Sequence, residues 1–255
     1  MIRWLLALLV FCGGPADATC RMALALGLDV SGSVDPMEYR LQRQGLAAAL
    51  VRPDVEASLL GHGGVYVRLA VYEWSGPGHQ EVVVGWTEVT DRAALTGLVQ
   101  QIATLPPAPT DGDFMGVEED NTGRRWDPST ALGTAMQTGA QLLASEGDCW
   151  QRKLDISGDG KRNTGPEPLE VRDGLVTQGI TINALVIGAD NPRHTDQRQA
   201  EVSELVSYFR TQVILGPGAF VETAIGFRDF EDAMVRKLKR ELENPVLSAL
   251  PEVWR

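Results

Sequence analysis

The sequence predicts an α/β fold: a doubly wound, mostly parallel six-stranded sheet with helices on both faces and one antiparallel edge strand. Apolar runs of strand length alternate with segments that are apolar on one face only, as in proteins built from strand–helix units. Segment 22–30 is a nearly continuous apolar run, which is typical of a parallel strand buried on both faces. Segments 65–74 and 80–86 are separated by a short turn containing Gly-Pro-Gly, so they can pair only as an antiparallel hairpin.

Each expected strand is a short run rich in aliphatic and β-branched residues. The expected strands are 22–30, 65–74, 80–86, 153–157, 181–187 and 211–215. The hairpin places segment 80–86 at an edge of the sheet. The remaining connections are long enough to carry helices, which is the pattern of parallel strands.

The helices are expected where apolar residues recur at helical spacing. The expected helices are 36–51, 91–104, 130–145, 170–178, 197–208 and 229–242. Asp35 is suited to cap the first helix, and Pro36 suits its first turn. Segment 105–128 contains prolines, glycines and several acidic residues, and we expect a long irregular loop there.

The first 18 residues are predicted to be a secretory signal peptide. Arg3 supplies the positive start, segment 4–12 is apolar, and residues 16–18 (Ala-Asp-Ala) form a cleavage site with small residues. The alternative is a buried N-terminal helix, but a strand begins directly after this segment, which favours the signal. Residues 19–255 are then expected to form a single domain, periplasmic or secreted, without stable membrane insertion after signal removal.

Composition narrows the class of partner. The 255-residue chain has 44% apolar and 22% charged residues, as in ordinary globular proteins. Its net charge of −11 argues against nucleic acid or anionic lipid as the main partner. Removal of the signal leaves two cysteines, Cys20 and Cys149, and an even number in an exported protein predicts one disulfide.

Polar side chains follow two of the predicted strands. Asp29 lies at the end of the first strand, with Ser31 and Ser33 directly after it, in the stretch LDVSGSVD, and Asp159 follows the fourth strand in SGDG. Ligands of doubly wound sheets lie beyond the carboxyl ends of the strands, and Mg²⁺ prefers oxygen ligands. Thr130 could add a further oxygen, although a hydroxyl at the start of a helix, taken alone, is more often a cap.

Three motifs in order resemble those of the von Willebrand factor A-type (VWA) domain, a Rossmann-like fold. Segment 29–33 matches its Asp-x-Ser-x-Ser motif, segment 130–136 is similar to its Thr-x-x-Gly-x-Ala-Leu motif, and Asp159-Gly160 matches its Asp-Gly turn. Each motif by itself is weak evidence for this family, but the order of the three motifs and their places in the α/β alternation make the resemblance specific. The resemblance covers segment 22–242, essentially the mature chain.

This resemblance implies a metal-ion-dependent adhesion site that holds an octahedral Mg²⁺ or Mn²⁺. It implies that Ser31, Ser33 and Thr130 bind the ion directly, and that Asp29 and Asp159 bind it directly or through water. An Asp or Glu carboxylate of a protein partner would complete the shell. The implied function is partner binding without catalysis.

One departure from the family pattern concerns the fourth strand. The turn after it reads Ser-Gly-Asp-Gly, whereas the family more commonly has Thr-Asp-Gly. We align Asp159, because Asp155 lies inside the strand and is expected to be a partly buried acid paired with an arginine. In the last helix, Lys237, Lys239 and Arg240 are expected on the exposed face and at the C-terminal end.

A closer resemblance is to a subfamily of exported bacterial A-type domains of unknown function (DUF1194-like). It is carried by segments 28–45, 154–165 and 216–238. It supports the fold and the site without naming a ligand. Because the first and fourth strands are neighbours in this fold, Cys20 and Cys149 are expected to pair at the sheet edge remote from the metal.

Two other functions stay open. One is a metal-dependent hydrolase or phosphotransferase that uses Asp29, although the motifs contain no evident general base. The other is a scaffold with a purely structural ion. The sequence contains no G-x-S-x-G elbow, dinucleotide-binding glycine motif or Walker loop.

Overall fold

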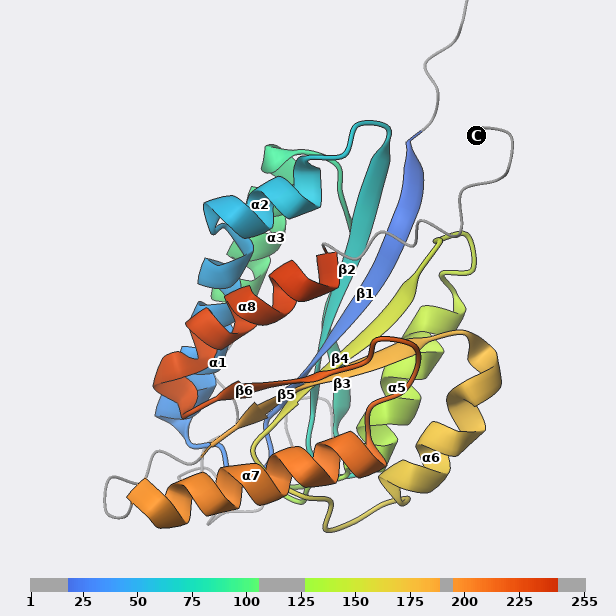
Figure 1. The fold of residues 1–255 in the computed structure, drawn as a ribbon. Helices are drawn as coiled ribbons and strands as arrows, with labels where there is room; N and C mark the ends of the chain where they lie inside the picture. The colour runs from blue at the N-terminus through green and yellow to red at the C-terminus, as the bar shows by residue number, and fades with distance from the viewer. Residues whose placement is uncertain (1–17, 106–126, 189–194, 243–255) are drawn as a thin grey trace, which may run out of the picture.

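The computed structural model describes residues 18–105, 127–188 and 195–242 (Figure 1). Residues 1–17 of the predicted signal peptide and most of the predicted loop 105–128 lie outside these ranges. Within the part of the chain that the structure describes, no helix is both long and apolar enough to cross a membrane.

A six-stranded sheet forms the centre of the domain, with the order β3-β2-β1-β4-β5-β6. The strands are β1 (Thr19–Asp29), β2 (Val65–Trp74), β3 (Gln80–Val89), β4 (Arg152–Gly158), β5 (Thr181–Ile187) and β6 (Val221–Ala224). Only the β2–β3 pair is antiparallel, and β3 lies at the edge. The predicted fold class, with its antiparallel edge strand, is therefore confirmed.

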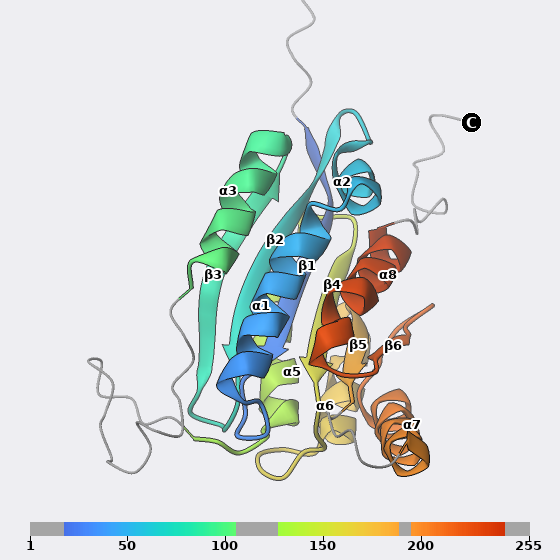
Figure 2. The same ribbon diagram turned by 90° about the vertical axis from the view of Figure 1, so that its left-hand side faces the viewer.

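Helices cover both faces of this sheet (Figure 2). The helices are α1 (Pro36–Leu50), α2 (Pro53–Leu60), α3 (Arg92–Ala103), α5 (Leu132–Ala144), α6 (Pro168–Leu175), α7 (Thr195–Gln212) and α8 (Phe230–Leu242). Side chains of α1, α2, α3 and α8 share one hydrophobic core with the sheet, and those of α5, α6 and α7 share the other. Helix α2 was not predicted, because its eight residues directly follow α1.

The predicted last strand at 211–215 is wrong. Helix α7 continues to Gln212, and Leu215 makes only an isolated bridge with Ile182. The last strand is β6, whose sequence Val-Glu-Thr-Ala has little apolar character. Val213 is fully buried, so the apolar run 213–215 contributes to the core through a turn instead of a strand.

The start of α1 is set by a capping box, which confirms the role predicted for Asp35. Its carboxylate accepts hydrogen bonds from the backbone N–H groups of Met37 and Glu38, and the Glu38 carboxylate accepts one from the backbone N–H of Asp35. This fixes where α1 begins after the loop 30–35.

The predicted disulfide is confirmed. Cys20 in β1 is bonded to Cys149, which precedes β4, with their Cα atoms 4.6 Å apart. Both residues lie at the amino ends of the two strands, opposite the edge where the candidate site residues gather.

Two expectations about charged residues are wrong. Asp155 is paired with Lys237 and not with an arginine, at 2.9 Å, and both side chains are buried. Lys237 also pairs with Glu241 at 2.7 Å, so it faces the sheet and not solvent. Burial raises the pKa of Asp155 to about 7, against the lowering effect of Lys237. One face of α8 thus carries its own buried charges.

Candidate metal centre

The candidate site lies at the carboxyl ends of the central strands, at the lower end of the sheet in Figure 2. Asp29 is the last residue of β1, and Asp159 follows β4, its neighbour in the sheet. The parallel pairing of these strands brings the two acids to one edge. This is the edge at which doubly wound sheets bind ligands.

Asp29 is fully buried. Its Oδ1 accepts a hydrogen bond from the backbone N–H of Ser31 at 2.8 Å. Its Oδ2 has no hydrogen-bond partner among the described residues. The backbone carbonyl of Asp29 accepts a hydrogen bond from Nε2 of Gln42 in α1, at 2.9 Å. The carboxylate is therefore held in place from one side, while its second oxygen is left for another partner.

Ser31, Ser33 and Asp159 continue the cluster in a chain of side-chain contacts. The hydroxyls of Ser31 and Ser33 are 3.2 Å apart, and the Ser33 hydroxyl donates to Oδ1 of Asp159 at 2.7 Å. Ser31 is buried, and Ser33 is exposed. The structure therefore brings four of the predicted site residues together, with an opening to solvent beside Ser33.

The loop that carries Thr130 is attached to the same edge by backbone hydrogen bonds. The N–H of Gly32 donates to the carbonyl of Pro128, and the N–H of Ala131 donates to the carbonyl of Ser75, both at 2.8 Å. These bonds connect the loop with the β1–α1 loop and with the end of β2. Three segments that are distant in the sequence thus meet at one place.

Thr130 itself contacts the loop that follows β4. Its N–H donates to Oδ1 of Asn163 at 2.8 Å, and its carbonyl accepts from the N–H of Asn163 at 3.1 Å. A Cβ atom placed on Gly160 would lie 4.0 Å from the Thr130 hydroxyl oxygen. Helix α5 begins at Leu132 without a side-chain cap, so the Thr130 hydroxyl is not used as one.

The electrostatics of this cluster favour a cation. Burial raises the pKa of Asp29 well above its usual range, and the nearby Asp159 carboxylate raises it further. Burial also raises the pKa of Asp159, against the lowering effect of the Ser33 hydrogen bond. Within residues 18–105, 127–188 and 195–242, neither carboxylate forms an ion pair with lysine or arginine. Carboxylates and hydroxyls with no cationic partner fit a hard divalent cation.

Gln42 and Asn163 support this arrangement but were not predicted. Gln42 holds the end of β1, and Asn163 holds the Thr130 loop. Gln42 is fully buried in a helix whose other buried positions are mostly apolar. The only feature of the sequence that could have indicated this role of Gln42 is the presence of an amide next to the apolar face of the helix.

A second group of acids does not form a comparable site. Glu146, Asp148 and Cys149 lie close together near the opposite edge of the sheet. Arg68 pairs with Glu146 at 2.7 Å and with Asp148 at 3.3 Å, and the sulfur of Cys149 is in the disulfide. The acids here already have a cation from the chain itself.

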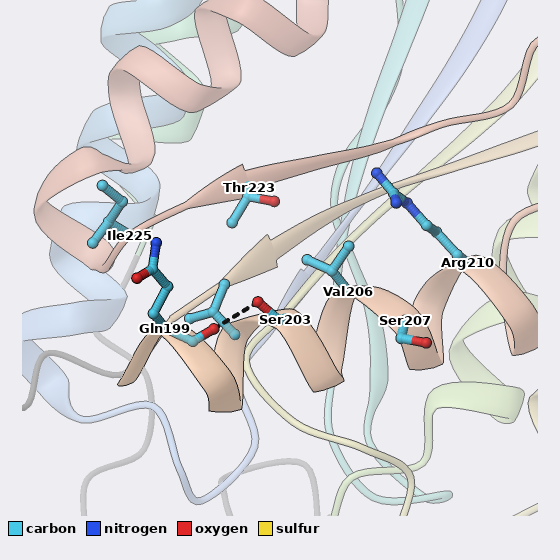
Figure 3. A pocket seen from close by; sticks show the side chains of 8 residues that line it. Gln199, Ser203, Val206, Ser207, Arg210, Thr223 and Ile225 are labelled. Carbon is cyan, nitrogen blue, oxygen red and sulfur yellow. Dashed lines mark hydrogen bonds between the residues drawn. The ribbon is translucent and has the colours of Figure 1, made fainter. Parts of the chain in front are cut away.

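A cavity of about 610 Å³ lies between α7 and β6 (Figure 3). Its lining includes Val206 and Arg210 of α7 and Thr223 of β6, and none of the residues predicted for the metal site. The outer edge of β6 is partly occupied, since the Thr223 carbonyl accepts a hydrogen bond from Arg236. The cavity and the candidate metal centre are therefore separate features.

Solved structures share this fold. A zinc-bound proximal thread matrix protein 1 from the mussel byssus, described as having a zinc-occupied MIDAS motif, is 14% identical, with a TM-score of 0.56 over 89% of this chain and 47% of that protein. A von Willebrand factor type A protein from Catenulispora acidiphila is 14% identical, with a TM-score of 0.51 over 88% of this chain and 43% of that protein. The pilus adhesin SpaC from Lactobacillus rhamnosus GG is 11% identical, with a TM-score of 0.54 over 88% and 30%.

This chain spans less than half the length of each of these three proteins, and at such low identity the likeness shows the A-type fold alone. No curated protein matches the chain in sequence. The model of one family, described as a protein of unknown function (DUF1194), matches residues 19–117 and 115–246. Since these segments cover most of the sequence, the chain belongs to the DUF1194 family, with a von Willebrand factor A-type fold.

Proposed function

We propose that this protein is a binding module outside the cytoplasm that captures a protein partner through a divalent cation, without catalysis. The cation is Mg²⁺ or Mn²⁺, and the partner supplies an Asp or Glu carboxylate. The Cys20–Cys149 disulfide supports the periplasm or the extracellular space as its location, because disulfides persist in oxidising compartments.

The observation that carries this proposal is the state of Asp29. A buried carboxylate oxygen without a partner is costly, and a second carboxylate beside it adds repulsion. A divalent cation would remove both costs. Proteins retain such an arrangement where a ligand provides the missing charge.

Asp29, Ser31, Ser33, Thr130 and Asp159 would hold the ion. A bound Mg²⁺ that has hydroxyls among its ligands keeps much of its charge, and can therefore attract a carboxylate from another molecule. Ser33 is exposed, so the side of the cluster on which it lies is open to a partner.

The alternative hydrolase or phosphotransferase function is less well supported. It requires Asp29 to reach a substrate as a nucleophile, whereas this side chain is fully buried and one of its oxygens is bonded to the backbone N–H of Ser31. A Mg²⁺-dependent phosphatase assay tests it: turnover that disappears in Asp29→Asn would favour an enzyme over a binding module.

The proposal is tested in two steps. Isothermal titration of the protein with MgCl₂ and MnCl₂ should show one site, which Asp29→Ala and Thr130→Ala remove. Asp173→Ala is the matched control, because it removes an exposed acid that pairs with its neighbour Arg172, far from the candidate site in the sequence. It should bind the ion like the wild type.

The second step captures partners from a periplasmic fraction with and without EDTA. A partner retained by the wild type in Mg²⁺ should be lost in EDTA and with Asp29→Ala. If EDTA lowers the melting temperature but capture is unchanged, the ion is structural and the proposal is wrong.

A further inference from the structure

Trp74 lies next to the candidate metal centre but belongs to none of its motifs. It is the last residue of β2, and its register partner in β1 is Asp29. The indole is fully buried. Its Nε1 has no hydrogen-bond partner within the described ranges. An indole N–H can only donate a hydrogen bond, and a buried donor without an acceptor is costly.

Gly158 shows how close the indole and the carboxylate are. A Cβ atom placed on Gly158 would lie 3.2 Å from Oδ2 of Asp29 and 3.4 Å from Cζ2 of Trp74. The unpartnered carboxylate oxygen and the indole therefore border the same point. Cζ2 and Nε1 belong to the same edge of the indole, so the edge that carries the N–H is the one turned toward this point.

The third neighbour of this point is Phe209 of α7, whose Cζ would lie 3.4 Å from the same Cβ. Phe209 is fully buried. The glycine thus leaves a narrow space that large side chains enclose, and the Asp29 carboxylate is at its border. A threonine at this position, as in the commoner Thr-Asp-Gly pattern, would place a Cβ in that space.

We infer that Trp74 is a positioning residue of the metal centre: its indole packs beside the Asp29 carboxylate and limits the orientations that the carboxylate can take, and Gly158 provides the space that this requires. The inference rests on the proposed metal binding and deepens it. Residues that orient metal ligands without touching the metal commonly change affinity 10- to 100-fold when they are replaced. Trp74 and Gly158 should therefore affect the affinity for the ion more than the stability of the metal-free fold.

Calorimetric titration with Mg²⁺ tests this on two pairs of variants. Trp74→Phe keeps an aromatic ring and removes the N–H edge, and should weaken Mg²⁺ binding about tenfold. Trp86→Phe is its matched control, because the Nε1 of Trp86 is also buried without a described partner but lies in β3, outside the site. It should bind Mg²⁺ like the wild type.

Gly158→Ala is an independent test that leaves Trp74 in place. The added methyl would crowd Asp29, so binding should again weaken about tenfold. Gly174→Ala is its control, since a Cβ there meets no atom within 4 Å. Thermal melting of each metal-free variant shows whether the fold is kept.

A spectroscopic measurement on the wild-type sequence tests whether the environment of Trp74 changes when the ion binds. In protein labelled with 5-fluorotryptophan, the ¹⁹F resonance of Trp74 should shift with Mg²⁺ at the concentrations at which calorimetry shows binding. The resonance of Trp86 should not shift. A structural tryptophan remote from the ion would give no such response.

The outcomes distinguish this inference from the proposed function. If the wild type binds Mg²⁺ and Asp29→Ala does not, but Trp74→Phe and Gly158→Ala bind like the wild type, the inference is wrong and the metal site stands. If the wild type does not bind Mg²⁺ or Mn²⁺, both are wrong.

Discussion

Asp155 lies inside strand β4 and Asp159 directly follows the same strand, yet their surroundings differ. Asp155 faces α8, where Lys237 lies 2.9 Å away and also pairs with Glu241. Asp159 lies at the strand end beside Asp29, with no described lysine or arginine paired to either acid. The chain thus supplies the cation for one group of acids and not for the other. This contrast separates a structural charge network from a candidate ligand site.

The largest effect on the free energy of unfolding is expected at Asp155, where the chain supplies its own cation, Lys237. Lys237→Met leaves Asp155 and Glu241 buried without their positive partner, and should lower the free energy of unfolding by about 3–5 kcal/mol. Urea denaturation measures it. Lys239→Met, which removes a half-exposed lysine of the same helix paired with Asp54, should change it by less than about 1 kcal/mol. If both variants changed the free energy of unfolding equally, Lys237 would not hold a buried structural charge network, and the contrast with Asp29 and Asp159 would be wrong.

The next largest effect on stability is expected from Mg²⁺ bound at the candidate metal centre, where the chain supplies no cation of its own among the described residues. Mg²⁺ at 100 times its dissociation constant should stabilise the wild type by about 2.7 kcal/mol, because only the folded state has the site. Asp29→Asn should lose this gain, and Lys239→Met should keep it. Thermal melting with and without Mg²⁺ makes the comparison, and a gain that persists in Asp29→Asn would place the ion elsewhere.

A third buried acid, Glu73, gives a pH-dependent test. It accepts a hydrogen bond from the Tyr39 hydroxyl at 2.7 Å, and burial raises its pKa to about 7, against the lowering effects of Tyr39 and Arg43. The folded protein therefore keeps this proton to higher pH than the unfolded chain. The contribution of Glu73 to the free energy of unfolding falls as the pH rises from about 4.5 to 7.

Glu73→Gln should remove that fall, because an amide does not titrate and its oxygen can still accept from Tyr39. At pH 8 the variant should be more stable than the wild type by up to about 3 kcal/mol, since each pKa unit corresponds to about 1.4 kcal/mol. Urea denaturation at pH 5 and pH 8 provides the measurement. An unchanged pH dependence would show that Glu73 is ionised in the folded protein throughout.

The smallest effect is expected for Asp29→Asn without metal. Because Asp29 has no cationic partner in the described chain, removing its charge should leave the free energy of unfolding within about 1 kcal/mol of the wild type, or above it. Urea denaturation in EDTA measures this. A loss comparable with that of Lys237→Met would mean that Asp29 is a structural acid like Asp155.

Most of the fold could be predicted because burial leaves a clear pattern. Segments 22–30 and 181–187 are mostly apolar, since both faces of a central parallel strand are covered by helices. Strand β6 has no such pattern, because it is short and lies at an edge, while the more apolar run 213–215 is a turn. Residue type alone could not separate these two.

The gathering of Asp29, Ser31, Ser33 and Asp159 could also be predicted, because these residues lie at or just after the carboxyl ends of neighbouring parallel strands. The inward orientation of Lys237 could not. A lysine in a helix rich in charges usually faces solvent, and only the packing of α8 against Asp155 turns it inward. The position of Trp74 beside Asp29 could not be predicted either, since a tryptophan in the segment 65–74 fits any buried strand.

The central claim is that the acids and hydroxyls at the carboxyl edge hold a divalent cation. The most direct test is a crystal structure grown with MnCl₂, in which anomalous scattering locates the metal. The account predicts one strong peak among the oxygens of Asp29, Ser31, Ser33, Thr130 and Asp159. No peak there, or a peak at Glu146 and Asp148 instead, would contradict it.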